Sequence, residues 1–469
     1  MPAIFLDPEA WAVQQFGQCV LGDLRRNKRL IKFAMQIVAR PDGSTPDQTE
    51  TWADCKATYR LFDQEDLTFD ALAVPHFEHT RRCSARGGVQ LLISDTTEIN
   101  FGQQRKVEGL GPTANGSGRG FFLHSSLMFD PARGQIEGLA GQKIFYRQPK
   151  SAKKVHKNSQ RRSKQRESLI WGKVFEDVGS PPEGTKWIHV CDRGADDFEV
   201  FHRAVRQQCS FVIRASKLNR LIIVPGDRQV KLRDYLHELP VRGTHTIVVR
   251  ASKDSPARTA TVELRYAQIG LPRPRVTTEW IRQNTPQAPL LVSVVELREA
   301  HPPQGVTPLR WVLYTREAVN SPTDASLIVS YYEQRPLIEE YHKALKTGCP
   351  VEERQYATAD RLERVTAVLS ILAVRLLQIK TIARETPERP AHEVAPARWV
   401  EVLQQIRKTK TKTKGVMTIH EFVRQLAGLG GHLGRKGDGQ PGWITLWRGL
   451  EKLLLIMRGA DIARRAKCG

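Results

Sequence analysis

The feature that most constrains the fold is a set of strand-type segments that follows a helical N-terminal region. Segment 89–101 is an apolar run with the length and composition of a strand, and segments 124–130 and 136–147 are predicted to continue it as antiparallel strands. A later strand of buried type ends at Asp192. Because open α/β sheets bind ligands at the carboxyl ends of their strands, Asp192 is a candidate site residue.

The pattern changes twice more along the chain. Residues 209–316 contain short strand-type segments separated by Gly/Pro turns, which predicts a mostly antiparallel β insertion. Segment 360–385 is long, helical and apolar on most sides, so we expect it to be buried.

Charge narrows the range of partners. The chain of 469 residues has 72 Lys and Arg against 50 Asp and Glu, a formal net charge of +22 at pH 7. This excess predicts a polyanionic partner, nucleic acid before a membrane. Apolar runs stay well short of a bilayer span and the N-terminus does not resemble a secretory signal, so we expect a cytoplasmic location and no membrane partner. Seven scattered cysteines without a C-x-x-C pair argue against a disulfide framework or a structural zinc site.

Basic residues gather in two regions. Residues 1–70 are helical and basic, with Asp23 as the N-cap of one helix, and this pattern suits contacts to DNA phosphates and to the major groove. The alternative is a small helical bundle with a solvated basic surface. Segment 150–166 has eight Lys or Arg and no acid, so it is either a phosphate-binding loop or a surface loop without a specific partner. The candidate DNA contacts of the N-terminal region are Arg25, Arg26, Arg29, Tyr59 and Arg60.

Segment 330–348 combines a phenol, two cations and a carboxylate at helical spacing. On one helix these four side chains would lie within roughly 60° of one another. A carboxylate flanked by cations suits a site that handles metal-bound phosphate, whereas the alternative is a solvated helix face with ion pairs. Pro336 disfavours a helical backbone at Arg335 and predicts a new helix from about that point. The four residues are Tyr332, Arg335, Glu339 and Lys346.

Three carboxylates follow one another in a suggestive order: Asp95 on the first strand, Asp192 at the end of a later strand, and Glu339 on a helix after the insertion. Two strand-borne Asp and one helix-borne Glu can converge on two Mg²⁺ ions, which prefer hard oxygen ligands, and Mn²⁺ is expected to substitute. A metal pair of this kind stabilises both the attacking and the leaving oxygen at phosphorus.

These motifs resemble the DDE transposases of bacterial insertion sequences, in the family that includes the transposon-five transposase. The Tyr-Arg-Glu-Lys signature of that family matches segment 332–346 at the family spacing. SDTTEI (94–99) and CDRGAD (191–196) match the two blocks that carry the catalytic Asp residues. The resemblance covers nearly the whole chain, from LGDLRRNKRL (21–30) to GGHLGRKGDGQPGWITLW (430–447).

The resemblance implies a role for each matched residue. The three carboxylates would be catalytic and hold the metal ions. Arg335 and Lys346 would hold phosphates of the transposon ends, with Tyr332 donating a hydrogen bond beside them. Trp311 matches the aromatic residue that fills the space of a flipped base, although it equally fits an ordinary core tryptophan of a strand. Arg214 matches a basic residue near the same site.

The implied fold is α/β, with a ribonuclease-H-like catalytic core interrupted by the mostly antiparallel β insertion and flanked by N-terminal and C-terminal helical domains. The predicted division is a DNA-end-binding domain (1–70), the first part of the core (71–208), the insertion (209–316), the last part of the core (317–385) and a dimerisation domain (386–469).

The implied function is cut-and-paste DNA transposition. The enzyme would nick the transposon ends, form and open a hairpin, and join the 3′ ends to target DNA. The alternatives are a non-catalytic DNA-binding regulator, against which the intact carboxylate triad argues, and a structure-selective nuclease.

The implied partners are the inverted-repeat ends, target DNA and a second copy of the chain in a paired-end complex, associated with the bacterial nucleoid. An apolar helical stripe within 443–457 that includes Leu450 and Leu454 is the predicted dimer contact. The alternative is that this stripe docks on its own domain.

Overall fold

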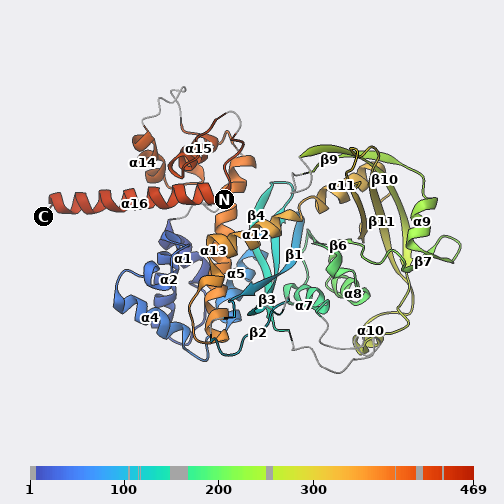
Figure 1. The fold of residues 1–469 in the computed structure, drawn as a ribbon, viewed down its shortest axis with the longest axis horizontal. Helices are drawn as coiled ribbons and strands as arrows, with labels where there is room; N and C mark the ends of the chain where they lie inside the picture. The colour runs from blue at the N-terminus through green and yellow to red at the C-terminus, as the bar shows by residue number, and fades with distance from the viewer. Residues whose placement is uncertain are drawn as a thin grey trace.

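The computed structural model describes residues 7–103, 106–114, 116, 118–147, 167–249, 257–385, 387–407, 416–435 and 438–468. Within these ranges the chain forms a mixed α/β structure with a 12-stranded, mostly antiparallel sheet. The helical N-terminal and C-terminal regions both lie to the left of the sheet in Figure 1. The basic segment 150–166 lies outside the described residues, so its predicted role is not addressed by the fold. No described helix is both long enough and apolar enough to cross a membrane.

The N-terminal region is helical, as predicted. The side chain of Asp23 accepts a hydrogen bond of 2.8 Å from the backbone N–H of Arg25 and so starts the second helix where the sequence indicated. Arg364, on the long helix that follows the insertion, connects this region to the rest of the chain by donating a hydrogen bond of 2.6 Å to the carbonyl of Phe62. The helices are α1 (Pro8–Phe16), α2 (Leu24–Ala39), α3 (Thr45–Gln48), α4 (Trp52–Phe62) and α5 (Phe69–Cys83).

One half of the sheet has mixed directions. Its order is β4-β3-β1-β5-β6, in which β3 is antiparallel to both β1 and β4, while β1, β5 and β6 run parallel. The predicted antiparallel continuation of the first strand is therefore confirmed. The strands are β1 (Gly88–Asn100), β2 (Gly111–Pro112), β3 (Arg119–Asp130), β4 (Gln135–Phe145), β5 (Thr185–Cys191) and β6 (Ser210–Arg214). The connecting helices are α7 (Leu169–Val178), η1 (Arg193–Ala195) and α8 (Phe198–Arg206).

Alternation along β1 explains why this sheet is covered on both faces. Leu91 and Ile93 belong to one hydrophobic cluster, shared with the N-terminal helices, whereas Leu92 belongs to a second cluster shared with α7 and α8. Successive side chains of a strand point to opposite faces, so an uninterrupted apolar run indicates helices or further chain on each side.

The insertion is antiparallel, as predicted, but it is not a separate sheet. Its last strand pairs antiparallel with β6, so the sheet continues from the first half into the insertion. Strand β6 itself was assigned to the insertion by the boundary at residue 209, yet it pairs in parallel with β5 and thus continues the first half. The elements are β7 (Leu221–Val224), β8 (Arg228–Lys231), α9 (Leu232–Glu238), β9 (Gly243–Val249), β10 (Arg258–Leu271), α10 (Glu279–Asn284), β11 (Leu290–Glu299) and β12 (Arg310–Thr315).

Helices form the remainder of the chain. The predicted long helix is α13, and it is buried along most of its length, where it packs against β4, α5 and α16. The elements are α11 (Pro322–Tyr332), α12 (Pro336–Lys343), the π-helical turn η2 (Ala344–Gly348), η3 (Val351–Glu353), α13 (Ala359–Glu385), η4 (Ala391–Glu393), α14 (Ala397–Arg407), α15 (Ile419–Leu429) and α16 (Trp443–Cys468).

A new helix begins at Pro336, as predicted, but the expectation of a non-helical Arg335 is wrong. Arg335 has φ −51° and ψ −37°, which is right-handed helical backbone. Its N–H donates to the carbonyl of Tyr332 at 3.0 Å, and its carbonyl accepts from Ile338 at 3.2 Å. These hydrogen bonds connect α11 to α12 through a tight turn and outweigh the steric preference that proline imposes on the preceding residue.

The apolar stripe of α16 mostly packs inside its own domain, so the predicted dimer contact at Leu450 is wrong. Leu450 and Leu453 are fully buried, and Leu454 is partly buried. The cause is a close crossing with α15: a Cβ added to Gly449 would lie 1.9 Å from the carbonyl oxygen of Leu426. The second half of α16 projects away from the body of the molecule (Figure 1). It leaves three apolar side chains exposed there: Leu455, Ile456 and Ile462.

Candidate active site

The sheet brings the two predicted aspartates to the same edge. β1 and β5 are parallel neighbours with Ser94 opposite Cys191, so Asp95 and Asp192 occupy equivalent positions on adjacent strands. Glu339 comes from α12, which packs against β1 and β3. The three carboxylates predicted from the sequence are therefore brought together by three different elements.

One guanidinium joins all three carboxylates. Arg335 Nη2 lies 2.8 Å from Asp95 Oδ2 and 3.8 Å from Asp192 Oδ2. Arg335 Nη1 forms an ion pair with Glu339 one turn further along the chain. The arginine of the signature thus lies at the centre of the acidic group, rather than beside it.

Backbone N–H groups orient the two aspartates. Thr96 N donates to Asp95 Oδ1 at 2.8 Å, and Gly194 N donates to Asp192 Oδ1 at 2.7 Å. In each carboxylate one oxygen is held by the chain, so the other is directed toward the shared cation. This arrangement presents two preoriented oxygens to whatever positive charge occupies the space between them.

Burial and like charges shape the electrostatics of the site. Burial raises the pKa of Asp95 to about 6; Arg335 opposes this shift, and the nearby charges of Asp192 and Glu339 add to it. Burial acts to lower the pKa of Arg335, but Asp95 and Glu339 outweigh it and the pKa is raised. The side chain of Glu339 is 57% exposed, so the site is open to a ligand from the solvent on the side of α12.

The donor set fits a hard divalent cation in its chemistry. Carboxylate oxygens are the ligands that Mg²⁺ and Mn²⁺ prefer. In the described part of the chain, however, no group of three or more His, Cys, Asp and Glu side chains lies in an arrangement that could hold a metal ion. We attribute this to Arg335, whose guanidinium fills the space toward which Asp95 and Asp192 point.

Three further predicted residues gather next to this group. The ring of Trp311, on β12, packs edge-on against Tyr332 with centroids 4.9 Å apart. Burial raises the pKa of Tyr332, while nearby Arg214 and Arg335 act to lower it. Arg214 also donates to the carbonyl of Arg310 at 3.2 Å. The structure therefore brings Trp311, Tyr332 and Arg214 together, with Trp311 only partly buried at the edge of the core.

Lys346 does not join the carboxylate group. Its Nζ lies 3.2 Å from Glu352, whose side chain also accepts from Asn100 N at 2.9 Å. The predicted common face breaks because residues after Lys343 form a π-helical turn, in which Cys349 N donates to Ala344 O at 3.0 Å. This wider turn rotates Lys346 relative to the spacing of an α-helix.

Some of the candidate DNA contacts in the N-terminal region are exposed, and others interact with neighbouring side chains. Arg26 pairs with Asp66 and Arg29 pairs with Asp54, at 2.7 and 2.8 Å, so both contribute to the fold of the region. Tyr59 packs against Tyr356 with centroids 5.3 Å apart. Arg25 and Arg60 are exposed, and Arg25 pairs with its own N-cap, Asp23.

Two exposed residues on α4 were not among the candidate DNA contacts. The side chain of Trp52 is strongly exposed, and Lys56 Nζ lies 5.2 Å from the centroid of its ring. With Arg60 these residues have spacing i, i+4, i+8, which puts them in one row along the helix. That spacing was the signal in the sequence that could have identified the row.

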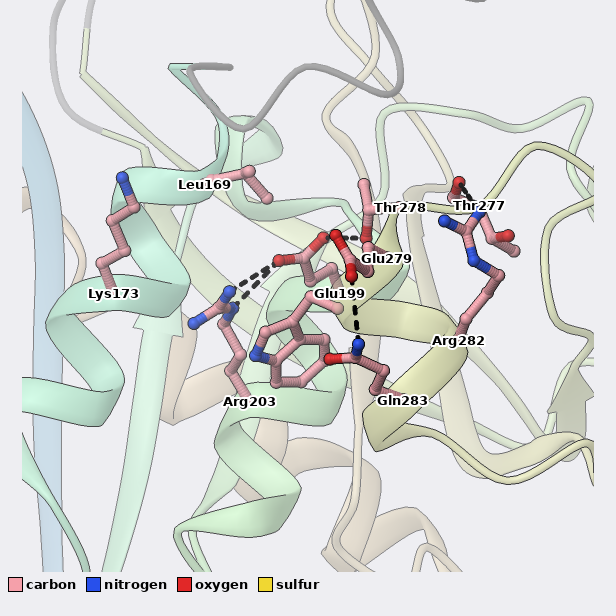
Figure 2. A pocket seen from close by; sticks show the side chains of 10 residues that line it. Leu169, Lys173, Glu199, Arg203, Thr277, Thr278, Glu279, Arg282 and Gln283 are labelled. Atoms are coloured by element: carbon pink, nitrogen blue, oxygen red, sulfur yellow. Dashed lines mark hydrogen bonds and ion pairs between the residues drawn. The ribbon is translucent and has the colours of Figure 1, made fainter.

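A cavity of about 610 Å³ lies away from the carboxylate group, between α7, α8 and the segment that contains α10 (Figure 2). Arg203 Nη2 lies 2.7 Å from Glu199, and its guanidinium stacks over Trp280 at 4.3 Å. Thr278 donates to Glu199 at 2.8 Å. Because its buried charged groups bind one another, the cavity is best explained as a junction between α8 and the insertion.

Two family models match the ends of the chain. A model described as transposase DNA-binding matches residues 8–67, which span α1 to α4. A model described as the Tn5 transposase dimerisation domain matches residues 371–468, from the middle of α13 to the end of α16. The regions predicted to bind DNA and to dimerise are thus similar to domains with these two roles.

Proposed function

Since the chain belongs to the Tn5-like transposase family, we propose that it is a metal-dependent, cut-and-paste DNA transposase of the bacterial cytoplasm. The observation that carries this proposal is the convergence of Asp95, Asp192 and Glu339 around one cation. Converging carboxylates would repel a DNA backbone unless they hold metal ions, so a purely DNA-binding regulator would gain nothing from them.

Two Mg²⁺ ions, or Mn²⁺ in their place, would supply Lewis-acid stabilisation of charge at the phosphate that reacts. Asp95, Asp192 and Glu339 would hold them. Arg335 would bind phosphate oxygens of the transposon end, and Tyr332 would donate a hydrogen bond nearby. Lys346, which pairs with Glu352 and not with the carboxylates, would contact another phosphate of the transposon end.

The proposed core is ribonuclease-H-like. The order β4-β3-β1-β5-β6, with β3 antiparallel to its neighbours, supports it because this arrangement puts Asp95 and Asp192 on adjacent parallel strands. In the proposed division, residues 1–70 recognise the ends and the C-terminal helices join two copies of the chain in a paired-end complex. Strand β6 belongs to the core in this scheme, with the insertion beginning after it.

The proposed reaction is a series of in-line displacements at phosphorus. Water first cuts one strand at each end, and the freed 3′ hydroxyl attacks the opposite strand to form a hairpin. Water then opens the hairpin, and the 3′ hydroxyl attacks target DNA. In every step an oxygen forms a bond to phosphorus while the bond to the leaving oxygen breaks, so a single site can serve all four. Trp311, beside Tyr332, would occupy the gap left by a flipped base during hairpin formation.

The products of a plasmid assay test this proposal against its alternatives. The substrate is a supercoiled plasmid that carries the DNA flanking the coding region on both sides of a marker. With purified protein and Mg²⁺ we expect excised fragments with hairpin ends, followed by products joined to a target plasmid. Cleavage without any joining would instead indicate a nuclease, and binding without cleavage would indicate a regulator.

A further inference from the structure

Arg335 lies among the three carboxylates that are proposed to hold metal. Its Nη2 is within 2.8 Å of Asp95 and 3.8 Å of Asp192, and its Nη1 pairs with Glu339. The side chain is only 20% exposed, and its Nε is buried without a hydrogen-bond partner among the described residues. The guanidinium thus makes its polar contacts at the carboxylates while part of it remains unsatisfied.

We propose that Arg335 is a latch that keeps divalent metal out of the site until DNA binds. In the DNA-free chain its guanidinium neutralises the carboxylates, and a phosphate of the DNA end draws it away and leaves the carboxylates for the metal. This inference rests on the metal and DNA roles assigned above, and adds that the two ligands are coupled through a single side chain.

The coupling follows from what one guanidinium can reach. Arg335 reaches Asp95 and Asp192 through Nη2 and Glu339 through Nη1, so a phosphate that draws the guanidinium toward itself takes the same cation from all three carboxylates. Once it leaves, three carboxylates remain without their cation, and a divalent ion offsets their repulsion. Lys346 cannot replace it at the carboxylates, since its Nζ is at Glu352. By linkage, metal and DNA must then raise each other's affinity by the same factor.

The backbone allows this exchange without a change of fold. Arg335 is the N-cap of α12 and is followed by Pro336, so its main chain is held by the turn between two helices. The two aspartates are fixed from the other side by Thr96 N and Gly194 N. The movable part is therefore the arginine side chain, which has several rotatable bonds.

Mn²⁺ binding to the full-length, DNA-free protein tests the latch, with free Mn²⁺ followed by electron paramagnetic resonance. We expect weak binding to the wild type and at least about tenfold tighter binding to Arg335→Gln, because the variant lacks the competing cation. The Mn²⁺ affinity of Arg335→Lys should be intermediate, since an ammonium keeps the positive charge but lacks the two Nη groups that reach separate carboxylates. Arg228→Gln is the control: it makes the same substitution at an arginine of β8 that pairs with Glu238 and not with the carboxylates, so its Mn²⁺ affinity should stay close to wild type.

A second arm adds DNA. A duplex carrying the inverted repeat that flanks the coding region should raise the Mn²⁺ affinity of the wild type toward that of Arg335→Gln, after subtraction of the duplex alone. The tighter binding of Arg335→Gln should also disappear when Glu339→Gln is added, which assigns the metal to this site.

The possible failures are distinct. Equal, tight Mn²⁺ binding by DNA-free wild type and Arg335→Gln would overturn the latch and leave the proposed metal site intact. Absence of Mn²⁺ binding in a folded wild type with DNA and in both arginine variants would overturn the metal site, and with it the proposed function. Thermal melting of each variant establishes that it is folded before the titration.

Discussion

Arg335 Nη2 lies 2.8 Å from Asp95 Oδ2, although the two residues are 240 positions apart in the chain. The contact exists because α12, which follows the whole β insertion, packs against β1. The acidic group is therefore assembled within a single chain, and its central cation is a side chain. A phosphate or metal ion that bound here would have to rearrange an existing ion-pair network, which makes that network a sensitive place for mutation.

The exposed row of α4 should determine affinity for the DNA ends. Replacing Lys56 or Arg60 by Ala should weaken binding, and each change should reduce the salt dependence of log K by about one unit if it removes one phosphate contact. Binding measured by fluorescence anisotropy over a salt series checks this. Trp52→Ala should reduce discrimination between ends and random DNA more than it changes the salt slope, because an aromatic ring contributes no charge.

The control for that series is Arg29→Ala. Arg29 is also basic, but it pairs with Asp54, a side chain that is 8% exposed. Its removal leaves the buried carboxylate paired with Lys32, so we expect lower thermal stability of the N-terminal region with a smaller effect on the salt slope. A steeper loss of DNA affinity for Arg29→Ala than for Arg60→Ala would contradict the assignment of the binding row.

Dimerisation should depend on the projecting half of α16. Leu455 and Ile456 are 46% and 41% exposed and lie within the matched dimerisation domain. Replacing both by Asp should weaken self-association at least roughly tenfold while single-end binding persists, because buried apolar anchors dominate interfaces. Sedimentation analysis and gel shifts with labelled ends measure the two properties separately.

Leu450→Asp provides the contrast. Leu450 is fully buried within its own domain, so a charge there should unfold the C-terminal helices rather than separate folded protomers. If Leu450→Asp stayed folded and monomeric while Leu455→Asp/Ile456→Asp stayed dimeric, the interface would lie on the inner stripe after all.

Much of the site was predictable from the sequence because it depends on local rules. Asp95 follows the apolar run inside β1, Asp192 directly follows the buried strand β5, and Asp23 caps a helix, so each belongs to a local pattern of the sequence. The ion pair between Arg29 and Asp54 joins two helices, and nothing in either helix alone indicates it. Lys346 was misplaced because a π-helical turn changes the period of the helix without an evident signature.

The inner stripe of α16 illustrates the same limit. Its amphipathic pattern correctly indicated a buried face, but a pattern does not say which surface covers it. The covering surface is set by the close crossing of Gly449 over the backbone of Leu426, which is a tertiary contact. For the same reason, the parallel pairing of β6 with β5 could not be separated from the antiparallel strands that follow.

Acid should destabilise the fold through buried histidines. His189 stacks on Phe175 at 3.7 Å, and neither ring nitrogen has a hydrogen-bond partner among the described residues. Burial lowers its pKa from 6.5 to about 3, so between these values the unfolded chain binds the proton and the folded chain does not. Above pH 6.5 the titration of His189 does not change the free energy of unfolding. Below pH 6.5 this free energy falls by up to about 1.4 kcal/mol per pH unit for one group.

His189→Leu should therefore raise the melting temperature, since it removes a buried ring that gains no hydrogen bond. The melting temperature of this variant should also fall less steeply as the pH is lowered. We expect roughly 1 kcal/mol of stabilisation at pH 7 and more at pH 5. Differential scanning calorimetry from pH 8 to about pH 5 checks the trend. His237→Leu, on the exposed side of α9, is the control and should leave the melting temperature almost unchanged. A variant of His189 that is less stable than wild type at pH 5 would show that the ring has a partner.

The proposed function requires the converging carboxylates to carry out metal-dependent cleavage of DNA. Glu339 and Glu340 are adjacent on α12, and about 100° of helix rotation separates them, so Glu339→Gln and Glu340→Gln form a matched pair. The measurement is the rate of strand cleavage at the element ends in Mg²⁺ for both variants and the wild type. We predict a loss of at least about a thousandfold for Glu339→Gln, because removal of one metal ligand forfeits several kcal/mol of charge stabilisation, and a near wild-type rate for Glu340→Gln. Cleavage by Glu339→Gln at the wild-type rate would contradict the account.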